Sequence, residues 1–323
     1  MDYFDVFNGD ADGLCALLQL RLAFPREATL VTGVKRDISL LERVPLVRGA
    51  SVTVLDISLE RNRDALLALL NGGARVAYFD HHFAGQIPQH AGLVAHIDGA
   101  VDVCTSMLVD RHVGGVQRSW AIAGAFGDNL DEAAQRMAAS LALRDAQIEA
   151  LQDLGQCLNY NAYGEREQDL FVAPAALYQL LLSHRDPFLF IEREPVLDTI
   201  RRGRRADLAL AMALEPSVAC DGGQVFLLPD APWSRRVRGD FANTLSRRAA
   251  GNAYALLTPD GHGDYVVSVR AAPGRPQGAD ALCRQFPGGG GRVAAAGIDR
   301  LAPHRLADFV RAFSQSYCQG HVH

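Results

Sequence analysis

The sequence of 323 residues predicts an α/β protein whose N-terminal part is a doubly wound, mainly parallel sheet. Segments rich in Val, Ile, Tyr and Phe alternate with helix-like segments through the first half of the chain. The composition, 49% hydrophobic and 21% charged, is ordinary for a globular protein. In addition, several of the strand-like segments end on a carboxylate, which indicates a polar site at one edge of the sheet.

The expected elements of the first half follow from this alternation. The predicted strands cover residues 2–8, 29–34, 51–57, 75–80, 92–98 and 119–128. The predicted helices cover residues 13–23, 59–71, 105–112 and 131–154. The polar segment 155–168 is expected to be a loop, and residues 175–183 are expected to form another helix.

The character of the sequence changes twice, which predicts three parts. Residues 1–190 form the N-terminal domain, residues 191–214 a helical connector and residues 215–323 a smaller C-terminal α/β domain. The connector is predicted because residues 193–212 are charged and have a helical pattern. In the C-terminal part we expect strands at 224–228, 253–257 and 265–270 and a final helix near 304–317.

Bulk properties exclude several functional classes. A net charge of −5 argues against a protein that grips long nucleic acid. No apolar run reaches about 18 residues and no secretory signal begins the sequence, so we expect a cytoplasmic protein without a membrane span. The six cysteines lie far apart without a C-x-x-C pair, and we expect free thiols in a reducing cytosol. Lys35 is the only lysine, and a GC-rich genome explains this bias toward arginine better than a phosphate-binding role does.

Four of the predicted strands end on potential metal ligands. These residues are Asp10 and Asp12, Asp56, Asp80 with His81 and His82, and Asp128. The carboxyl ends of parallel strands meet at one sheet edge, so we expect these side chains to converge. Several carboxylates in one partly buried site repel one another unless a positive charge, such as a divalent cation, lies between them. Carboxylates mixed with imidazole suit Mn, Fe or Zn better than Ca. A single Asp at a strand end is commonly a helix N-cap, but the joint pattern predicts a dinuclear metal site.

The same stretches resemble a known family. GDADG, LDIS, FDHH and FGDN are similar to the four motifs of the DHH phosphoesterase superfamily, which includes RecJ exonucleases, nano-RNases, cyclic dinucleotide phosphodiesterases and family II pyrophosphatases. GGGGRVAAAG at 288–297 resembles the glycine-rich signature of the DHH-associated C-terminal domain, and YVVSVR at 265–270 resembles its substrate-contacting strand. LNYNAYG at 158–164 is similar to the loop that follows motif four in RecJ-like members.

The resemblance implies a role for each matching residue. Two divalent ions are expected, Mn²⁺ first with Mg²⁺ or Co²⁺ as alternatives, and Asp56 would bridge them. The implied metal ligands are Asp10, Asp12, Asp56, His81 and Asp128. The implied catalytic residues are His82, near the scissile phosphate, and Asp80, which supports the histidines. The implied substrate-binding residues are Asn8, Asn161, Arg270, Gly289, Gly290, Gly291 and Arg292.

Two positions depart from the family pattern. Val6 stands where many members carry a histidine ligand, with Asn8 closer to the site, so one metal is expected to be held weakly or Asn8 to orient a water. Arg292 stands where a histidine is common, and we expect it to meet a phosphate without shuttling a proton. Residues 293–296 are expected to begin a helix whose N-terminus faces an anion.

The resemblance is strongest to a compact proteobacterial subgroup that includes a pGpG-cleaving enzyme of cyclic di-GMP signalling. It implies a phosphodiesterase that hydrolyses linear dinucleotides, pGpG above all, or very short oligoribonucleotides to nucleoside monophosphates. Long nucleic acid and membranes are not expected as partners, and a homodimer is left open. A nucleoside bisphosphate phosphatase, a cyclic dinucleotide phosphodiesterase and a catalytically silent nucleotide-binding module remain alternatives. Tyr160 and Tyr163 are candidates for base stacking or for core packing.

Overall fold

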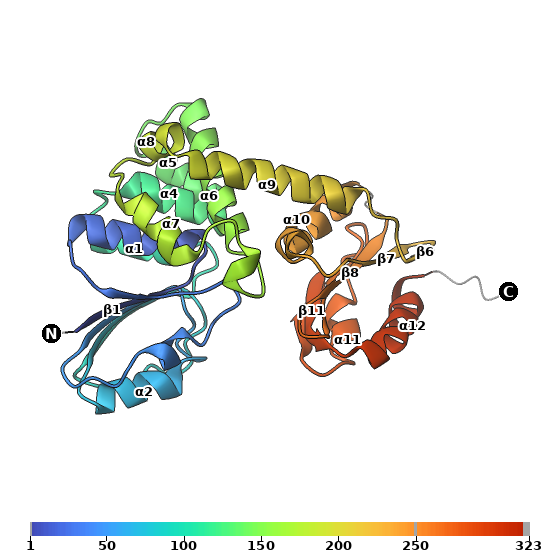
Figure 1. Cartoon of the computed structure of the whole chain (residues 1–323), viewed down its shortest axis with the longest axis horizontal. Helices are drawn as coiled ribbons and strands as arrows, with labels where there is room; N and C mark the ends of the chain where they lie inside the picture. The colour runs from blue at the N-terminus through green and yellow to red at the C-terminus, as the bar shows by residue number, and fades with distance from the viewer. Residues whose placement is uncertain (1, 249–250, 319–323) are drawn as a thin grey trace. The chain divides into compact units, whose positions relative to one another are not determined.

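The chain folds as two compact units in a computed structural model that describes residues 2–248 and 251–318 (Figure 1). The first unit is Met1–Arg202 and the second is Gly203–His323. The division falls inside helix α9 (Pro195–Met212), within the segment that the sequence predicts to be a helical connector.

A parallel sheet of five strands forms the centre of the first unit. Its strands are β1 (Tyr3–Phe7), β2 (Thr29–Val31), β3 (Ser51–Leu55), β4 (Arg75–Asp80) and β5 (Leu93–Ile97). Their order is β2-β1-β3-β4-β5, and every neighbouring pair is parallel. The predicted doubly wound, parallel architecture is therefore confirmed, and its first five strands lie where the alternation placed them.

Each face of this sheet packs against its own hydrophobic core. Successive residues of a strand point to opposite faces, so Val6 packs into one core and its neighbour Phe7 into the other. Helix α2 (Arg63–Asn71) lies on the face opposite to α1 (Ala11–Ala23), as Figure 1 shows. The remaining helices of the unit are α3 (Thr105–His112), α4 (Arg118–Gly127), α5 (Asp131–Ala139), α6 (Asp145–Asn161), α7 (Pro174–Leu182) and α8 (Pro187–Arg193).

Two sequence-based expectations about helices are wrong. Residues 119–128 form helix α4 and not a strand, because a run of apolar residues that is buried on all sides has no periodicity to distinguish the two structures. The expected single helix at 131–154 is split into α5 and α6, and α6 continues to Asn161, into the first part of the segment 155–168 that is expected to be a loop. Among the described helices, none combines the length and the apolar character that a membrane crossing requires.

A mixed sheet of six strands forms the second unit. Its strands are β6 (Val218–Cys220), β7 (Gly223–Leu227), β8 (Ala253–Pro259), β9 (Tyr265–Arg270), β10 (Gly289–Arg292) and β11 (Ala295–Leu301). The order is β10-β11-β9-β8-β7-β6, with β7 and β8 parallel and the other described pairs antiparallel. The helices are α10 (Pro232–Arg248), α11 (Ala279–Cys283) and α12 (Leu306–Tyr317). The α/β character expected of this part is confirmed.

The glycine-rich run forms a β-hairpin and not the start of a helix. Strand β10 pairs antiparallel with β11, with Arg292 opposite Ala295. The glycines are needed for close packing, since a Cβ at Gly289 would collide with the carbonyl oxygen of Cys283. Gly291 also has a φ of 136°, a conformation that other residues rarely adopt. The expected helix N-terminus after residue 292 is therefore wrong.

The cysteines also differ from the expectation. Cys220, at the end of β6, forms a disulfide with Cys318, which follows α12, across a sequence separation of 98 residues. The other four cysteines are free and buried. Sequence spacing gives no sign of this pair, because the two cysteines meet only after α12 has packed against Gly223 of β7.

Candidate metal centre

The predicted ligands gather where the strand order of the first sheet reverses. The chain leaves β1 for β2 on one side, whereas β3 lies on the other side of β1. Such a reversal leaves a crevice outside the carboxyl ends of the two strands, where doubly wound folds bind ligands. Asp10 follows β1 and Asp56 follows β3. Asp56 is buried with a φ of 58°, a strained conformation of the kind found at functional sites.

The GDADG stretch forms the N-terminus of α1. Asp10 is the N-cap residue, and its Oδ1 accepts hydrogen bonds from the backbone N–H groups of Asp12 (3.0 Å) and Gly13 (3.1 Å). Position 13 requires glycine, because a Cβ there would collide with the carbonyl oxygen of Asn8. The cap and the glycine together fix the direction in which both carboxylates point.

Asp12 is held by a second helix N-terminus. Its two carboxylate oxygens accept hydrogen bonds from the backbone N–H groups of Thr105 and Ser106, both at 2.7 Å, in the first turn of α3. The partial positive charge of a helix N-terminus stabilises an anion there. The Thr105 hydroxyl also donates to Asp56 Oδ1 at 3.3 Å, so α3 positions two of the predicted ligands.

His81 presents one ring nitrogen to this cluster. Its Nδ1 lies 3.0 Å from the carbonyl oxygen of Val103, to which only a protonated nitrogen can donate. In a neutral ring Nε2 is then an acceptor, and it faces Asp56 Oδ1 at 3.5 Å and Asp128 Oδ2 at 3.7 Å. Three acceptor atoms that face one another at these distances are suited to a cation between them. The hydrogen bond at Nδ1 is the usual support of a metal-binding histidine.

Two groups of side chains have the spacing of a metal site. One consists of Asp12, His81 and Asp128, the other of Asp56, His81 and His82, and within each group the ligand atoms lie within 4.8 Å of one another. Asp128 reaches the cluster from the C-terminal end of α4, not from a strand as the sequence predicted. Carboxylates with imidazole form the donor set that Mn, Fe and Zn prefer, so these residues fit the implied metal. Asp10 belongs to neither group.

Burial and the neighbouring carboxylates raise the pKa of two members of the cluster, Asp128 and Asp56. Burial and the neighbouring charges of Asp12 and Asp10 raise the pKa of Asp128 to about 6. Burial, followed by the charges of Asp10 and Asp12, raises the pKa of Asp56. Full ionisation of the cluster is therefore costly in the protein alone, and a bound cation would remove that cost.

Asp80 and His82 form a pair beside the metal-ligating groups. Asp80 is fully buried, and its Oδ1 lies 2.7 Å from Nδ1 of His82. The other oxygen, Oδ2, accepts from the backbone N–H of Leu59 at 3.3 Å. The hydrogen bond to Asp80 raises the pKa of His82, and the side chain of His82 is 46% exposed. His82 is thus accessible to a ligand, and Asp80 favours its protonated form.

Asn8 and Asn161, both expected to bind substrate, are engaged within the protein. Asn161 is buried, and its side chain donates to the carbonyl oxygen of Val172 (2.8 Å) and accepts from the Val172 N–H (3.1 Å). Asn8 accepts from the Asp10 N–H at 3.2 Å and donates to the carbonyl oxygen of Lys35 at 3.1 Å. Both side chains therefore support the surrounding loops, and their contact with substrate stays a prediction.

The two tyrosines considered for base stacking have other neighbours. Tyr160 is buried in the core of the first unit. Tyr163 has the ammonium of Lys35 over its ring, 5.7 Å from the ring centre.

The expected substrate contacts of the second unit lie on adjacent strands. Arg292 of β10 is opposite Ala295 of β11, and Ala295 is in turn opposite Arg270 of β9. Directly opposite residues share a sheet face, so both arginines stand on the same face with Ala295 between them. Gly289, Gly290 and Gly291 precede Arg292 on the same edge strand.

Lys35 and Asn159 belong to the cluster and were not identified as site residues from the sequence. Lys35 Nζ lies 2.6 Å from Asp10 Oδ2 and 2.9 Å from Asn159 Oδ1. The only available signal was that Lys35 is the sole lysine among 32 basic residues. Asn159 lies inside α6 and gives no signal in the sequence.

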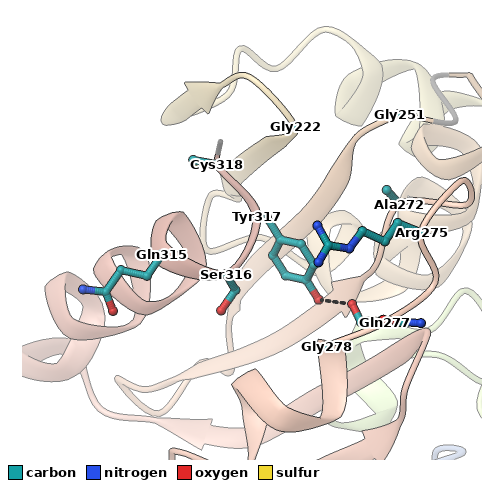
Figure 2. Close-up of a pocket in the computed structure, with 10 residues that line it drawn as sticks. All are labelled: Gly222, Gly251, Ala272, Arg275, Gln277, Gly278, Gln315, Ser316, Tyr317 and Cys318. Carbon is teal, nitrogen blue, oxygen red and sulfur yellow. Dashed lines mark hydrogen bonds between the residues drawn. The ribbon is translucent and has the colours of Figure 1, made fainter. Parts of the chain in front are cut away.

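A separate cleft of about 700 Å³ lies in the second unit. Figure 2 shows Arg275, Gln277, Tyr317 and Cys318 at its wall, with the Tyr317 hydroxyl donating to the carbonyl oxygen of Gln277 at 3.3 Å. Its described lining includes none of the predicted site residues, and we assign no chemistry to it.

No family model matches the chain, and no curated protein matches its sequence. Several solved structures, however, have the same fold. A DHH-domain protein described as a member of the s1p family of ribosomal proteins has a TM-score of 0.66 and 14% identity, over 97% of this chain and 86% of its own. A manganese-bound RecJ exonuclease has a TM-score of 0.65 and 18% identity, over 98% and 90%. The chain therefore has the DHH-type fold, which confirms the resemblance of the motifs at the level of the fold.

A more compact structure is also similar. The pGpG-specific phosphodiesterase PggH from Vibrio cholerae has a TM-score of 0.54 and 14% identity, and the similarity covers 98% of each chain. The similarity in fold therefore extends over nearly the full length of both chains.

Proposed function

We propose that this protein is a phosphodiesterase dependent on two divalent ions, Mn²⁺ in the first place, which hydrolyses linear dinucleotides such as pGpG or very short oligoribonucleotides to nucleoside monophosphates. The observation that carries the proposal is the position of His81. Its Nδ1 is held by Val103, and its Nε2 faces the oxygens of Asp56 and Asp128. A cation explains why these acceptors face one another.

The residues of the first unit divide into two roles. Asp12, Asp56, His81 and Asp128 would hold the metal, and the α3 N-terminus keeps Asp12 in place. Paired divalent ions, when bound, stabilise the attacking and leaving oxygens of an in-line displacement at phosphorus. His82, whose positive charge is favoured by Asp80, would donate a proton or a hydrogen bond to the leaving oxygen.

Separate features of the two units favour a short nucleotide as the substrate. Phe83 follows His82 directly and is 75% exposed, which leaves an aromatic surface for a base next to the catalytic histidine. Arg270 and Arg292 offer guanidinium groups that suit phosphate oxygens. The net charge of −5 does not favour long nucleic acid as the substrate. PggH, which shares the architecture, acts on pGpG.

Product analysis by chromatography tests the proposal. The protein is incubated with Mn²⁺ and, separately, with pGpG, pApA, a pentaribonucleotide, cyclic di-GMP and pyrophosphate. The variant His82→Ala serves as the test of the site, and His90→Ala, which changes an exposed histidine outside the cluster, serves as the matched control. We expect conversion of pGpG to GMP by the protein and by His90→Ala, with a loss of about 100-fold or more in His82→Ala.

The other outcomes separate the alternatives. Equal cleavage of all short RNAs would make the protein a general nano-RNase. Preference for cyclic di-GMP would make it a cyclic dinucleotide phosphodiesterase. Retention of nucleotide without product, with Mn²⁺ bound, would contradict the proposal and indicate a silent binding module.

A further inference from the structure

Lys35 is fixed in place by its own backbone. Its N–H donates to the carbonyl oxygen of Ala162 at 2.9 Å, and its carbonyl oxygen accepts from Asn8 Nδ2 at 3.1 Å. These bonds tie the segment after β2 both to the residues that follow β1 and to the end of α6. The side chain therefore starts from a defined point beside the carboxylate cluster.

The ammonium group of Lys35 lies among oxygens on one side and an aromatic ring on the other. Nζ is 2.6 Å from Asp10 Oδ2, 2.9 Å from Asn159 Oδ1 and 3.9 Å from Asp128 Oδ1. The ring of Tyr163 completes the surroundings with a cation–π contact. The side chain is 29% exposed, so the charge is only partly screened by solvent.

Both carboxylate oxygens of Asp10 accept hydrogen bonds within the protein while this pair exists. Its Oδ1 accepts the two backbone hydrogen bonds that cap α1, and its Oδ2 accepts from Lys35. The two groups with metal-site spacing both contain His81 and both leave Asp10 out. The carboxylate that the sequence assigns to a metal is thus neutralised by a residue of the protein itself.

We propose that the Lys35 ammonium is a resident cation of the cluster, which competes with one divalent ion for Asp10 and so keeps one of the two metal positions weak. This inference rests on the proposed function, because it presumes that the remaining ligands bind a metal. The 2.6 Å distance between Lys35 Nζ and Asp10 Oδ2 means that a divalent ion approaching this oxygen meets the ammonium group.

Lysine is the residue that suits this role. Its ammonium is a compact point charge with three donors, whereas the planar guanidinium of arginine needs more room. Arginine accounts for the rest of the 32 Lys and Arg residues, and the single lysine lies at this cluster. The adjacent Arg36, by contrast, pairs with Glu165 away from Asp10, with Nη1 2.5 Å and 2.6 Å from its two oxygens.

Titration of the metal-free protein with Mn²⁺ by calorimetry tests the inference. Lys35→Met removes the charge and keeps an unbranched side chain, and Lys35→Gln is a second, polar variant without charge. Arg36→Met is the matched control, since it removes a positive charge from the neighbouring position of the same loop. The rise in melting temperature on adding Mn²⁺ is measured for all four proteins as a readout independent of activity.

In Lys35→Met and Lys35→Gln we expect the weaker Mn²⁺ site to tighten about tenfold or more, because the competing charge is gone. The Mn²⁺-induced rise in melting temperature should be larger than in the original protein, and Arg36→Met should bind Mn²⁺ as the original protein does. Unchanged or weaker Mn²⁺ binding in both Lys35 variants would overturn the inference and leave the proposed function standing, provided that the original protein binds Mn²⁺. Absence of Mn²⁺ binding in every variant would overturn both.

Discussion

The carboxylate of Asp80 and the ring of His82 are joined by a contact of 2.7 Å between Oδ1 and Nδ1. The backbone N–H of His82 donates to the same oxygen at 3.2 Å, so one buried carboxylate fixes both the main chain and the ring of the histidine. Asp80 ends a central strand, and His82 extends from it into the exposed side of the site. The geometry makes Asp80 a positioning residue for His82.

Replacing Asp80 by asparagine tests this relationship. Asp80→Asn keeps the size of the side chain but removes the charge that raises the pKa of His82, so we expect kcat to fall about 10- to 100-fold with Mn²⁺ affinity nearly unchanged. The matched control is Asp98→Asn, since Asp98 follows the neighbouring strand β5 and pairs with Arg111 at the surface. A loss of Mn²⁺ binding in Asp80→Asn would show instead that Asp80 is a metal ligand.

Alanine variants of the two histidines should show separate effects on metal binding and on turnover. His81→Ala removes the nitrogen that both metal-spaced groups share, and we expect Mn²⁺ affinity to fall together with activity. His82→Ala removes the proposed proton donor, and we expect kcat to fall while at least one Mn²⁺ ion still binds. Calorimetry and steady-state kinetics on both variants check the division. Equal loss of Mn²⁺ binding in the two would argue against separate roles.

Phe83 should contribute to nucleotide affinity. Base stacking on an aromatic side chain is worth about 1–3 kcal/mol, so we expect Phe83→Ala to raise the KM for pGpG about tenfold with little change in kcat. An abasic analogue with the same phosphodiester should show no change. Phe24→Ala, at another exposed phenylalanine, provides the control. An identical rise in KM for the abasic analogue would contradict a stacking role.

The buried ion pair between Asp5 and Arg21 should be important for stability. Arg21 donates to Asp5 Oδ2 from Nε at 2.7 Å and to the Thr53 hydroxyl from Nη2 at 3.0 Å, and the pair is almost inaccessible to solvent. Removing one partner leaves an uncompensated buried charge, so Arg21→Met should lower the free energy of unfolding by about 3–5 kcal/mol in urea. Arg136→Met, which breaks an exposed pair, should cost at most about 1 kcal/mol. Similar effects of the two changes would contradict this account.

Thiol counts check the disulfide. The structure has one disulfide and four buried free cysteines, and burial raises the pKa of Cys283 to about 12. We expect Ellman's reagent to find almost no reactive thiol in the native protein and four after unfolding without a reductant. Six thiols in the unfolded, unreduced protein would support the sequence-based expectation and contradict the Cys220–Cys318 bond.

The sequence predicts the first sheet well because its strands carry strong local signals. β1, β3 and β4 are short apolar runs that end on polar residues, and parallel strands bring such ends to one edge. These two signals were sufficient to predict that Asp10, Asp12 and Asp56 lie at the same edge of the sheet. The sequence also predicts that Asp128 lies near these residues, as the structure shows, but it assigns the preceding segment to a strand. A helix of small, fully buried residues has the pattern of a buried strand.

Long-range contacts were not predictable from local patterns. Lys35 lies 25 residues from Asp10 and 124 from Asn159 along the chain, and no spacing rule connects them. No spacing rule predicts the disulfide either, because its cysteines lie near opposite ends of the second unit's sequence. Asn161 matched a motif, but only the structure shows that both ends of its side chain bind Val172.

Anomalous diffraction from crystals grown or soaked with Mn²⁺ tests the central claim most directly. Data collected at the manganese absorption edge locate the ion without reference to activity. The account predicts a strong anomalous peak within coordination distance of His81 Nε2 and of oxygens from Asp56 or Asp128. Manganese bound only elsewhere, or a hydrogen bond in place of a metal at His81 Nε2 with Mn²⁺ in excess, would contradict it.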